Sequence, residues 1–356
     1  MSTLSSNSSL SFDKDALPSL QQAWADRDRA GKPVLTTFGE IGVTDLPSAA
    51  TCIAYLDADG HPELGVVNPD HVFDNRDLDR LFSFCTFREW SRKDHEPRRG
   101  ILLMGPSGTG KTSYFANRFA QRGIPVYREV GNPDVVVSDW LKTKEVVNAT
   151  TFYEAGSLLK AMTEGCPLVI EEINLLNPAQ LTSLNEVIEK GAAMDPETRQ
   201  TVRAKRGFQV FGTLNGAFTE DRQGINAGIR RQNVAVLNRF YKFMYSEASK
   251  EQEIECIRRV HPEIPVALAS MMAEFAVMTR AAASDTGFDG RRLLQGVSRR
   301  HLLDWADMLK GMSYLKDSGV NLAAYTLNFV YTANLGPEEA ATVQHLLDLA
   351  FNNDTL

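Results

Sequence analysis

Short apolar runs alternate with amphipathic stretches through the middle of the chain. Apolar side chains recur at helical spacing in residues 75–90, 112–121, 156–165 and 178–191. The runs between them are short and bounded by Gly, Pro or polar residues, which predicts buried strands: "GILLMG" (100–105), "IPVYREV" (124–130), "PLVIEE" (167–172) and "FQVFGTLN" (208–215). Apolar strands separated by helices are typical of an α/β fold with a parallel sheet covered by helices on both faces.

Beyond about residue 245 the pattern becomes helical throughout. Residues 246–356 are therefore predicted to form an all-helical domain, with helices at 250–260, 265–283, 299–312 and 337–351. The α/β domain before it is expected to span residues 76–245. Residues 13–75 are expected to be an accessory segment with a β-element on both sides of the turn Asp59–Gly60, and residues 1–12 a flexible tail.

Composition narrows the range of functions. The chain has 356 residues and a formal charge of -7, so no global positive field attracts nucleic acid. The four cysteines are scattered, without a CxxC pair or a nearby histidine, which argues against a zinc site and a disulfide framework. With no export-signal pattern and no run of about 18 apolar residues, the chain is expected to be soluble and cytoplasmic, without a membrane partner.

The stretch "GPSGTGKT" at residues 105–112 predicts a phosphate-binding loop. Its three glycines let the backbone turn its N–H groups inward at the start of the next helix, which makes an anion site. Lys111 would reach the β- and γ-phosphates of ATP, and the Thr112 hydroxyl would complete a Mg²⁺ site. A plain Gly-rich turn, the alternative, would not need the Lys-Thr pair. The predicted nucleotide contacts are Gly105, Pro106, Ser107, Gly108, Thr109, Gly110, Lys111, Thr112 and Ser113.

Polar side chains end two of the predicted strands, at the edge where ligands bind in open α/β sheets. Glu171 would hold the Mg²⁺ through water and Glu172 would polarise the attacking water, while Asn215 could orient the same water. Asp is more usual at the first of these positions, and the longer Glu171 leaves the metal geometry less determined. The alternative is that the carboxylates merely end a strand and that Asn215 forms a turn.

These motifs, followed by "NVAVLNRFYKFMY" and "GVSRRHLLDWADML", together resemble the AAA+ superfamily of ATPases. The stretch "FYEAGSLLKAMTEGCPLVIEEINLLNPAQLTSLNEVIEKG" is similar to the MoxR/midasin side of that superfamily. The helical tail resembles the cobaltochelatase ATPase subunit and the CbbQ/NorQ activases. The resemblance covers residues 76–310 and implies an AAA+ P-loop core with a C-terminal helical lid.

The resemblance also implies roles for two arginines. Arg239 would be the finger that reaches the γ-phosphate of a neighbouring subunit, and Arg300 the sensor 2 residue of the lid. Arg299 competes with Arg300, because both lie in the first turn after the expected N-cap Ser298. Hydrolysis would then require a homo-oligomer, for which a hexameric ring is expected and a helical or open assembly is the alternative. Each arginine could instead be a solvated surface residue.

Relatives of this type carry two hairpins that face the pore of the ring. Here residues 133–153 and 194–208 are the candidates, and the second contains Arg199, Arg203, Lys205 and Arg206. Such a cluster suits an acidic peptide or a phosphate backbone, although a solvated basic turn is as good an interpretation. In residues 219–240, Arg230 and Arg231 could assist Arg239 or bridge subunits.

Three functions from different classes remain open at this point. The first is an ATP-driven motor that remodels or activates a protein partner, which in such relatives is commonly a separate von Willebrand factor A-type protein. The second is a nucleic-acid motor resembling the McrB-type GTPases or phage and defence ATPases. The third is a scaffold that binds nucleotide without hydrolysing it, which Glu171 in place of Asp would explain.

Overall fold

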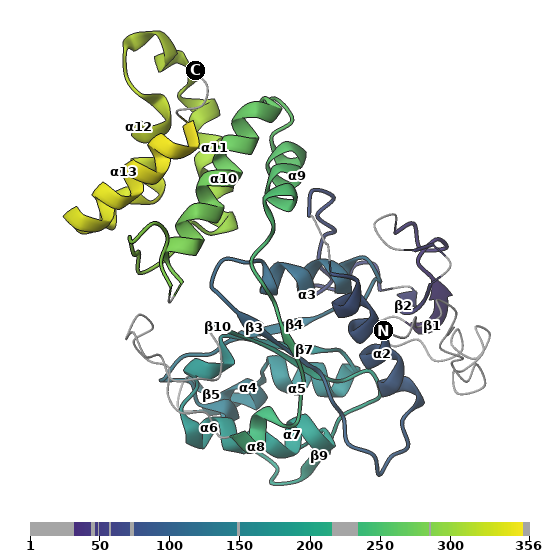
Figure 1. Ribbon diagram of the computed structural model, residues 1–356. Helices are drawn as coiled ribbons and strands as arrows, with labels where there is room; N and C mark the ends of the chain where they lie inside the picture. Colours follow the sequence, from purple (N-terminus) through teal and green to yellow (C-terminus); the bar gives the residue numbers. More distant parts are fainter. Residues whose placement is uncertain are drawn as a thin grey trace, which may run out of the picture.

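A five-stranded parallel sheet forms the centre of the lower body in Figure 1. The computed structural model describes residues 32–43, 47–48, 50–56, 58–71, 75–147, 150–215, 234–284 and 286–351. The strand order is β11-β3-β10-β7-β4, with bounds Tyr241–Met244, Ile101–Gly105, Val210–Asn215, Leu168–Glu171 and Tyr127–Val130. All neighbouring pairs are parallel, which confirms the predicted α/β core. The edge strand β11 was not predicted, because alternate residues along it are exposed.

Strand residues alternate between two hydrophobic cores, one on each face of the sheet. In β3, Ile101 and Leu103 join one core, whereas Leu102 and Met104 join the other. The first face is covered by α2 (Arg76–Ser91) and α3 (Lys111–Ala120), and Phe82 of α2 is fully buried there. Because both faces are covered, the inner strands β3, β7 and β10 are apolar at nearly every position and not at every second one.

Among the described residues, five short helices cover the second face. They are α4 (Val137–Leu141), α5 (Ser157–Glu164), α6 (Pro178–Ser183), α7 (Asn185–Lys190) and α8 (Val234–Leu237). The single helix predicted at residues 178–191 is therefore wrong in detail. The α-helix is interrupted at the fully buried Leu184, whose N–H donates to the carbonyl of Leu181, three residues back, and not to that of the residue four back.

Three antiparallel hairpins project from this core. Strands β5 (Lys142–Val147) and β6 (Thr150–Ala155) pair, as do β8 (Ala192–Met194) and β9 (Thr201–Arg203), so both predicted insertions contain a hairpin. Near the N-terminus, β1 (Lys32–Thr37) pairs with β2 (Thr51–Leu56). The expected β-element across Asp59–Gly60 is wrong, since the partner of β2 lies upstream and residues 61–67 form no strand.

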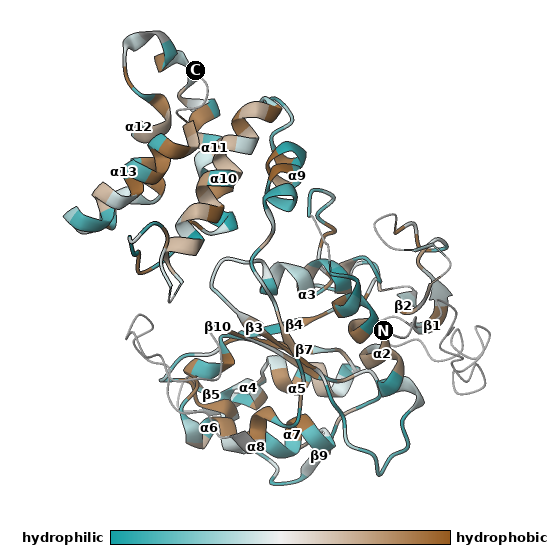
Figure 2. Ribbon diagram, viewed as in Figure 1, coloured by the Kyte–Doolittle hydropathy of each residue, from teal (hydrophilic) through white to brown (hydrophobic). Residues whose placement is uncertain are grey.

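The C-terminal part is all helical, as predicted, and forms the upper body in Figure 1. Its helices are α9 (Lys250–Val260), α10 (Val266–Ala282), α11 (Arg299–Gly311), α12 (Leu322–Val330) and α13 (Pro337–Phe351). They enclose a separate core around the fully buried Trp305, whose indole N–H donates to Ala323 O at 3.2 Å and Thr326 Oγ1 at 3.0 Å. In Figure 2 hydrophobic residues gather in the sheet and along these helices. Among the described residues, no helix is both long and apolar enough to cross a membrane.

Candidate nucleotide-binding site

Three adjacent strands end at one edge of the sheet and bring the loop 105–112 together with the predicted residues Glu171, Glu172 and Asn215. Strand β10 lies between β3 and β7, and Asn215 is in register with Gly105, where β3 enters the loop. Glu171 ends β7 at the same edge, since all three strands run in the same direction. Three segments that are distant in sequence therefore meet where the loop 105–112 begins.

The loop adopts a backbone conformation with positive φ angles, which its glycines favour. Gly105, Gly108 and Gly110 have φ angles of 151°, 74° and 100°, in the region that favours glycine. A Cβ at Gly108 would lie 2.6 Å from the Cβ of Ser298, so the residue that precedes α11 lies directly against the loop. Of the other predicted contacts, Pro106, Ser107 and Ser113 are exposed, and the Thr109 hydroxyl donates to Pro106 O at 3.0 Å.

Lys111 is buried and folded back onto the loop. Its Nζ donates to the carbonyl oxygens of Gly105 at 3.0 Å and Pro106 at 2.6 Å. Burial lowers the pKa of the Lys111 ammonium to about 8, although the carboxylate of Glu172 opposes this shift. The ammonium thus lies inside the loop, where phosphate oxygens could replace the two carbonyls as acceptors.

Thr112 and Glu171, the two residues predicted to bind Mg²⁺, are hydrogen bonded to each other. The Thr112 hydroxyl donates to Glu171 Oε2 at 3.2 Å, so the longer carboxylate reaches from the end of β7 to the start of α3. Mg²⁺ prefers oxygen ligands and usually retains several waters. A hydroxyl and a carboxylate at this separation fit that requirement, and Glu in place of Asp does not break the pair.

Glu172 is held from two sides. Its backbone is left-handed, with φ 51° and ψ 41°, as the chain leaves β7 for the short 3-10 helix η2 (Ile173–Leu175). Its Oε1 accepts a hydrogen bond from Asn215 Nδ2 at 3.0 Å, and its backbone N–H donates to Thr213 Oγ1 at 3.1 Å. Thr213 was not predicted. Its position two residues before Asn215 places both side chains on one face of β10, a signal that the sequence did contain.

The structure separates the two candidate sensor arginines. Arg299 lines a pocket beside the loop, between the sheet and the helical part, together with Asn75, Thr109, Tyr245, Ser246, Glu247, Ala248 and Gln252. The adjacent Arg300 is exposed and lines no part of this pocket. Ser298 caps α11, as predicted, with its side chain accepting from the N–H of His301 at 3.3 Å.

Arg239 lies at the opposite edge of the sheet from the loop of its own chain. It precedes β11, whose Tyr241 is in register with Ile101 at the start of β3. Arg239 and Gly105 therefore lie near opposite ends of β3, which is about 16 Å long at ~3.3 Å per residue. Arg239 Nε donates to Glu189 Oε2 of α7 at 3.0 Å. Arg230 and Arg231 lie outside the described residues.

The two hairpins on the second face of the sheet are joined by salt bridges. Lys142 Nζ, on β5, lies 2.8 Å from Asp195 Oδ2 and 2.6 Å from Glu197 Oε2, in the loop between β8 and β9. The hydrogen bond from Lys142 lowers the pKa of Asp195 to about 2. In the predicted basic cluster, the Arg206 guanidinium donates to the carbonyls of Trp90 and Arg92.

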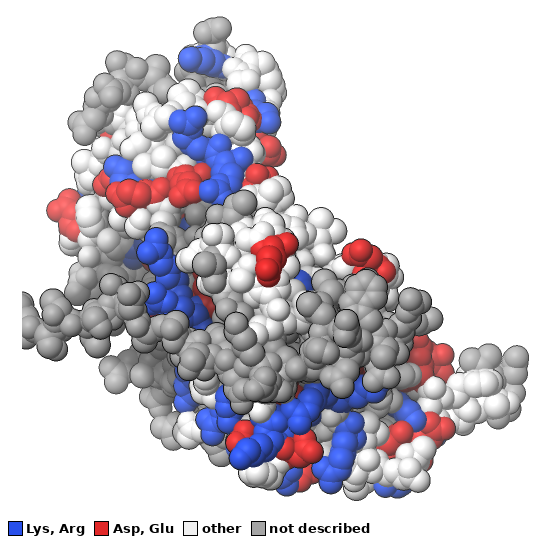
Figure 3. Space-filling model, turned by 90° about the vertical axis from the view of Figure 1, so that its right-hand side faces the viewer, with Lys and Arg blue, Asp and Glu red and all other residues white. Residues whose placement is uncertain are grey.

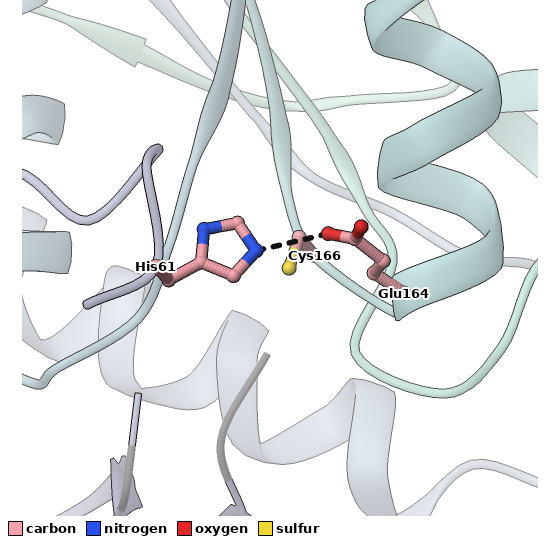
Figure 4. A group of neighbouring side chains, drawn as sticks. All are labelled: His61, Glu164 and Cys166. Carbon is pink, nitrogen blue, oxygen red and sulfur yellow. Dashed lines mark hydrogen bonds and ion pairs between the residues drawn. The ribbon is translucent and has the colours of Figure 1, made fainter. Parts of the chain in front are cut away.

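The fold also brings together His61, Glu164 and Cys166, whose ligand atoms lie within 4.8 Å of one another (Figure 4). No histidine lies near Cys166 in sequence. His61 Nε2 is 3.0 Å from Glu164 Oε2, and Nδ1 accepts from the backbone N–H of Glu63 at 3.1 Å. In the neutral ring the proton is then on Nε2, where it is donated to Glu164. A metal bound at Nε2 would move this proton to Nδ1, where it would clash with the backbone N–H of Glu63. The cluster is therefore poorly suited to binding a metal. We interpret the cluster as a hydrogen-bonded contact that holds residues 58–71 to the core.

Similarity to known proteins agrees with this geometry. Residues 100–232 match the family model of the AAA domain (dynein-related subfamily). The chain is 30% identical over 148 residues to uncharacterized protein SH1500 of Staphylococcus haemolyticus, covering 40% of this chain and 53% of that one. It is 31% identical over 147 residues to YojN of Bacillus subtilis, covering 40% and 46%. It is 26% identical over 155 residues to midasin of Giardia intestinalis, covering 43% of this chain and 3% of midasin.

The matched region thus spans about half the length of the first two relatives. Among solved structures, the RuvB Holliday junction branch migration motor of Thermotoga maritima has 16% identity and a TM-score of 0.44, covering 72% of this chain and 69% of RuvB. With the parallel sheet and the loop at its edge, the family match confirms the predicted AAA+ P-loop fold.

Proposed function

We propose that this chain, which carries an AAA domain at residues 100–232, binds ATP with Mg²⁺ and hydrolyses it. One observation above all supports the proposal. Beside the buried Lys111 of the loop, Thr112 is hydrogen bonded to Glu171 and Asn215 is hydrogen bonded to Glu172, so these five polar groups lie together at one sheet edge.

Each residue then has a defined task. Lys111 exchanges its bonds to the loop carbonyls for bonds to phosphate oxygens. Thr112 and Glu171 would hold Mg²⁺, which when bound neutralises phosphate charge. Glu172, kept in place by Asn215, accepts a hydrogen bond from the water that displaces ADP from the γ-phosphorus.

For the sensor role we favour Arg299 over Arg300. Arg299 lines the pocket between the loop and the helical part, and it follows Ser298, which lies against Gly108. A guanidinium there can bind phosphate oxygens in the same protomer. Arg300, exposed on the next position of α11, has no comparable access.

The location of Arg239 supports an assembly in which two copies complete one site. Its own loop lies at the other edge of the sheet, so its guanidinium can serve only a neighbouring copy. Such an arginine accelerates phosphoryl transfer by ~10³–10⁵ in well-studied cases. We propose a closed ring, with six copies expected from the MoxR-like resemblance, in which the helical lid begins near residue 246.

The hairpins favour a polypeptide as the substrate. Val146, Phe152 and Tyr153 of the first hairpin and Met194 of the second are exposed apolar or aromatic residues, a composition suited to gripping protein chains. On the face shown in Figure 3, basic and acidic residues are interspersed over the described part of the chain. We therefore propose a motor that remodels or activates a separate protein partner, of which a von Willebrand factor A-type protein is the expected kind.

Steady-state phosphate release tests the ATPase proposal. The wild-type protein is expected to release phosphate in the presence of ATP and Mg²⁺, and Glu172→Gln is expected to bind ATP without turnover. Glu186→Gln, an exposed carboxylate on α7 that pairs with Lys190, serves as the matched control and should keep full activity. If the assembled wild-type protein binds ATP but never releases phosphate, the scaffold function is correct instead.

A capture experiment separates the protein substrate from nucleic acid. Glu172→Gln with ATP should hold the substrate-engaged state, and its co-purifying partners can be identified by mass spectrometry. A duplex or single-stranded DNA shift that weakens steeply with salt would instead favour a nucleic-acid motor.

A further inference from the structure

A buried carboxylate in the helical part lies between two arginines. Glu253 of α9 is 1% exposed, and its two oxygens accept from different guanidinium groups. Arg280 Nη2 lies 2.7 Å from Oε1, and Arg299 Nε lies 2.9 Å from Oε2. A buried ion of this kind is costly unless it is paired, and the two arginines offset the cost of burying the Glu253 carboxylate.

The two arginines are anchored differently. Arg280 is fixed by further bonds, since its Nε donates to Val297 O at 2.8 Å and its Nη1 to Ala248 O at 3.3 Å. Arg299 uses only Nε, and its two terminal nitrogens form no hydrogen bond with any residue in the described ranges. Arg299 also lines the pocket beside the loop, so its free end can bind a ligand there.

We infer that Glu253 is a positioning residue for ATP binding: it holds Arg299 by Nε so that the terminal nitrogens are presented to the nucleotide phosphates. The inference rests on the proposed ATPase function. Through Arg280, the same carboxylate is joined to Ala248, in the segment that connects β11 to α9. The buried carboxylate of Glu253 thus links Arg299, the proposed nucleotide contact, to the segment between the sheet and the helical part.

Removing that charge affects the two arginines unequally. Two cations would then face each other in a buried site, with the acidic Glu247 as the further charged group near Arg280. Arg280 retains its two carbonyl partners, whereas Arg299 loses its only hydrogen bond to a described side chain. Arg299 is therefore the one that leaves, and the nucleotide loses a fixed, charged donor.

A double-mutant cycle on nucleotide affinity tests the inference with the full chain. The Kd of a fluorescent ATP analogue is measured for wild type, Glu253→Gln, Arg299→Gln and the double variant. Each single change is expected to weaken binding about tenfold, as for loss of one charge-assisted hydrogen bond. The double variant should match Arg299→Gln alone. Glu253→Asp, which keeps the charge that Arg280 needs but is one methylene shorter, provides a second test should Glu253→Gln fail to fold.

Glu255→Gln on the same helix is the matched control, because Glu255 pairs with Arg259 at the surface; its Kd should be unchanged. The inference is overturned if the Glu253 variants, or Arg299→Gln, have the Kd of the wild type. It is also overturned if changing Glu253 weakens the affinity as much in the Arg299→Gln background as in the wild type. If the wild-type protein binds no nucleotide, the proposed function is overturned as well.

Discussion

Replacing Thr213 by valine removes one hydroxyl from a buried position and leaves its shape almost unchanged. Thr213 is 2% exposed, and its Oγ1 is the acceptor for the backbone N–H of Glu172 at 3.1 Å. Glu172 occupies the left-handed region, which costs a non-glycine residue about 1–2 kcal/mol. The hydrogen bond is thus one of the interactions that keeps this residue in its conformation.

The cost of losing this hydrogen bond and the cost of the left-handed backbone at Glu172 are of similar size. Leaving a buried N–H without a partner costs ~1–3 kcal/mol, which is enough to cancel the preference for the observed backbone. Once Glu172 spends most of its time elsewhere, kcat is expected to fall about tenfold, corresponding to ~1.4 kcal/mol. The KM for ATP should stay unchanged, because Lys111 and Thr112 keep their contacts.

The assay is phosphate release at varied ATP concentration. Thr213→Ser, which keeps the hydroxyl, should retain near wild-type kcat. Thr163→Val is the matched control, since its hydroxyl only bonds helix carbonyls, with Leu159 O at 2.9 Å. Full activity of Thr213→Val, or a Thr213→Ser variant as slow as Thr213→Val, would show that the hydroxyl of Thr213 does not hold Glu172 in its active conformation.

Three further outcomes follow from the contacts. Burial lowers the pKa of Lys111 to about 8 in the free site, and bound phosphate would raise it. The affinity for ATP should therefore be full below about pH 8 and fall up to ~tenfold per pH unit above it. An ATP affinity, measured by fluorescence, that stays constant up to about pH 9.5 would contradict this. Lys142→Met should speed hydrogen exchange in residues 195–200, where its ion pairs lie, and Lys144→Met on the same strand should not. Trp305→Ala should destabilise the helical part by about 3–5 kcal/mol in urea denaturation, and a loss below ~1 kcal/mol would show that its core is not as packed as described.

The parts of the fold that were predictable are those with a local physical cause. The three inner strands β3, β7 and β10 are apolar at nearly every position because both faces are buried, and the loop 105–112 needs its glycines for backbone angles that other residues avoid. The edge strand β11 lacked this signal, since alternate residues face solvent. Helix α12 was missed as well, because "LAAYTLNFV" is apolar almost throughout and shows weak helical periodicity.

The remaining features depend on contacts between distant segments. Arg299 and Arg300 both lie in the first turn of α11, about 100° apart around the helix axis, and only the packing of that helix decides which one faces the pocket. Glu253 appears in sequence as one of several charges on an amphipathic helix. Its burial became visible only when α9, α10 and α11 were placed together.

If each site is completed by Arg239 from a second copy, mixing two inactive variants should restore turnover. Glu172→Gln lacks the group that polarises water but still supplies the arginine; Arg239→Ala lacks the arginine but keeps its own Glu172. Each variant alone should be nearly inactive, while an equal mixture should regain about a quarter of wild-type turnover, the share of random interfaces that pair an intact Glu172 with an intact Arg239. A mixture as inactive as its components, or full activity of Arg239→Ala alone, would contradict the account.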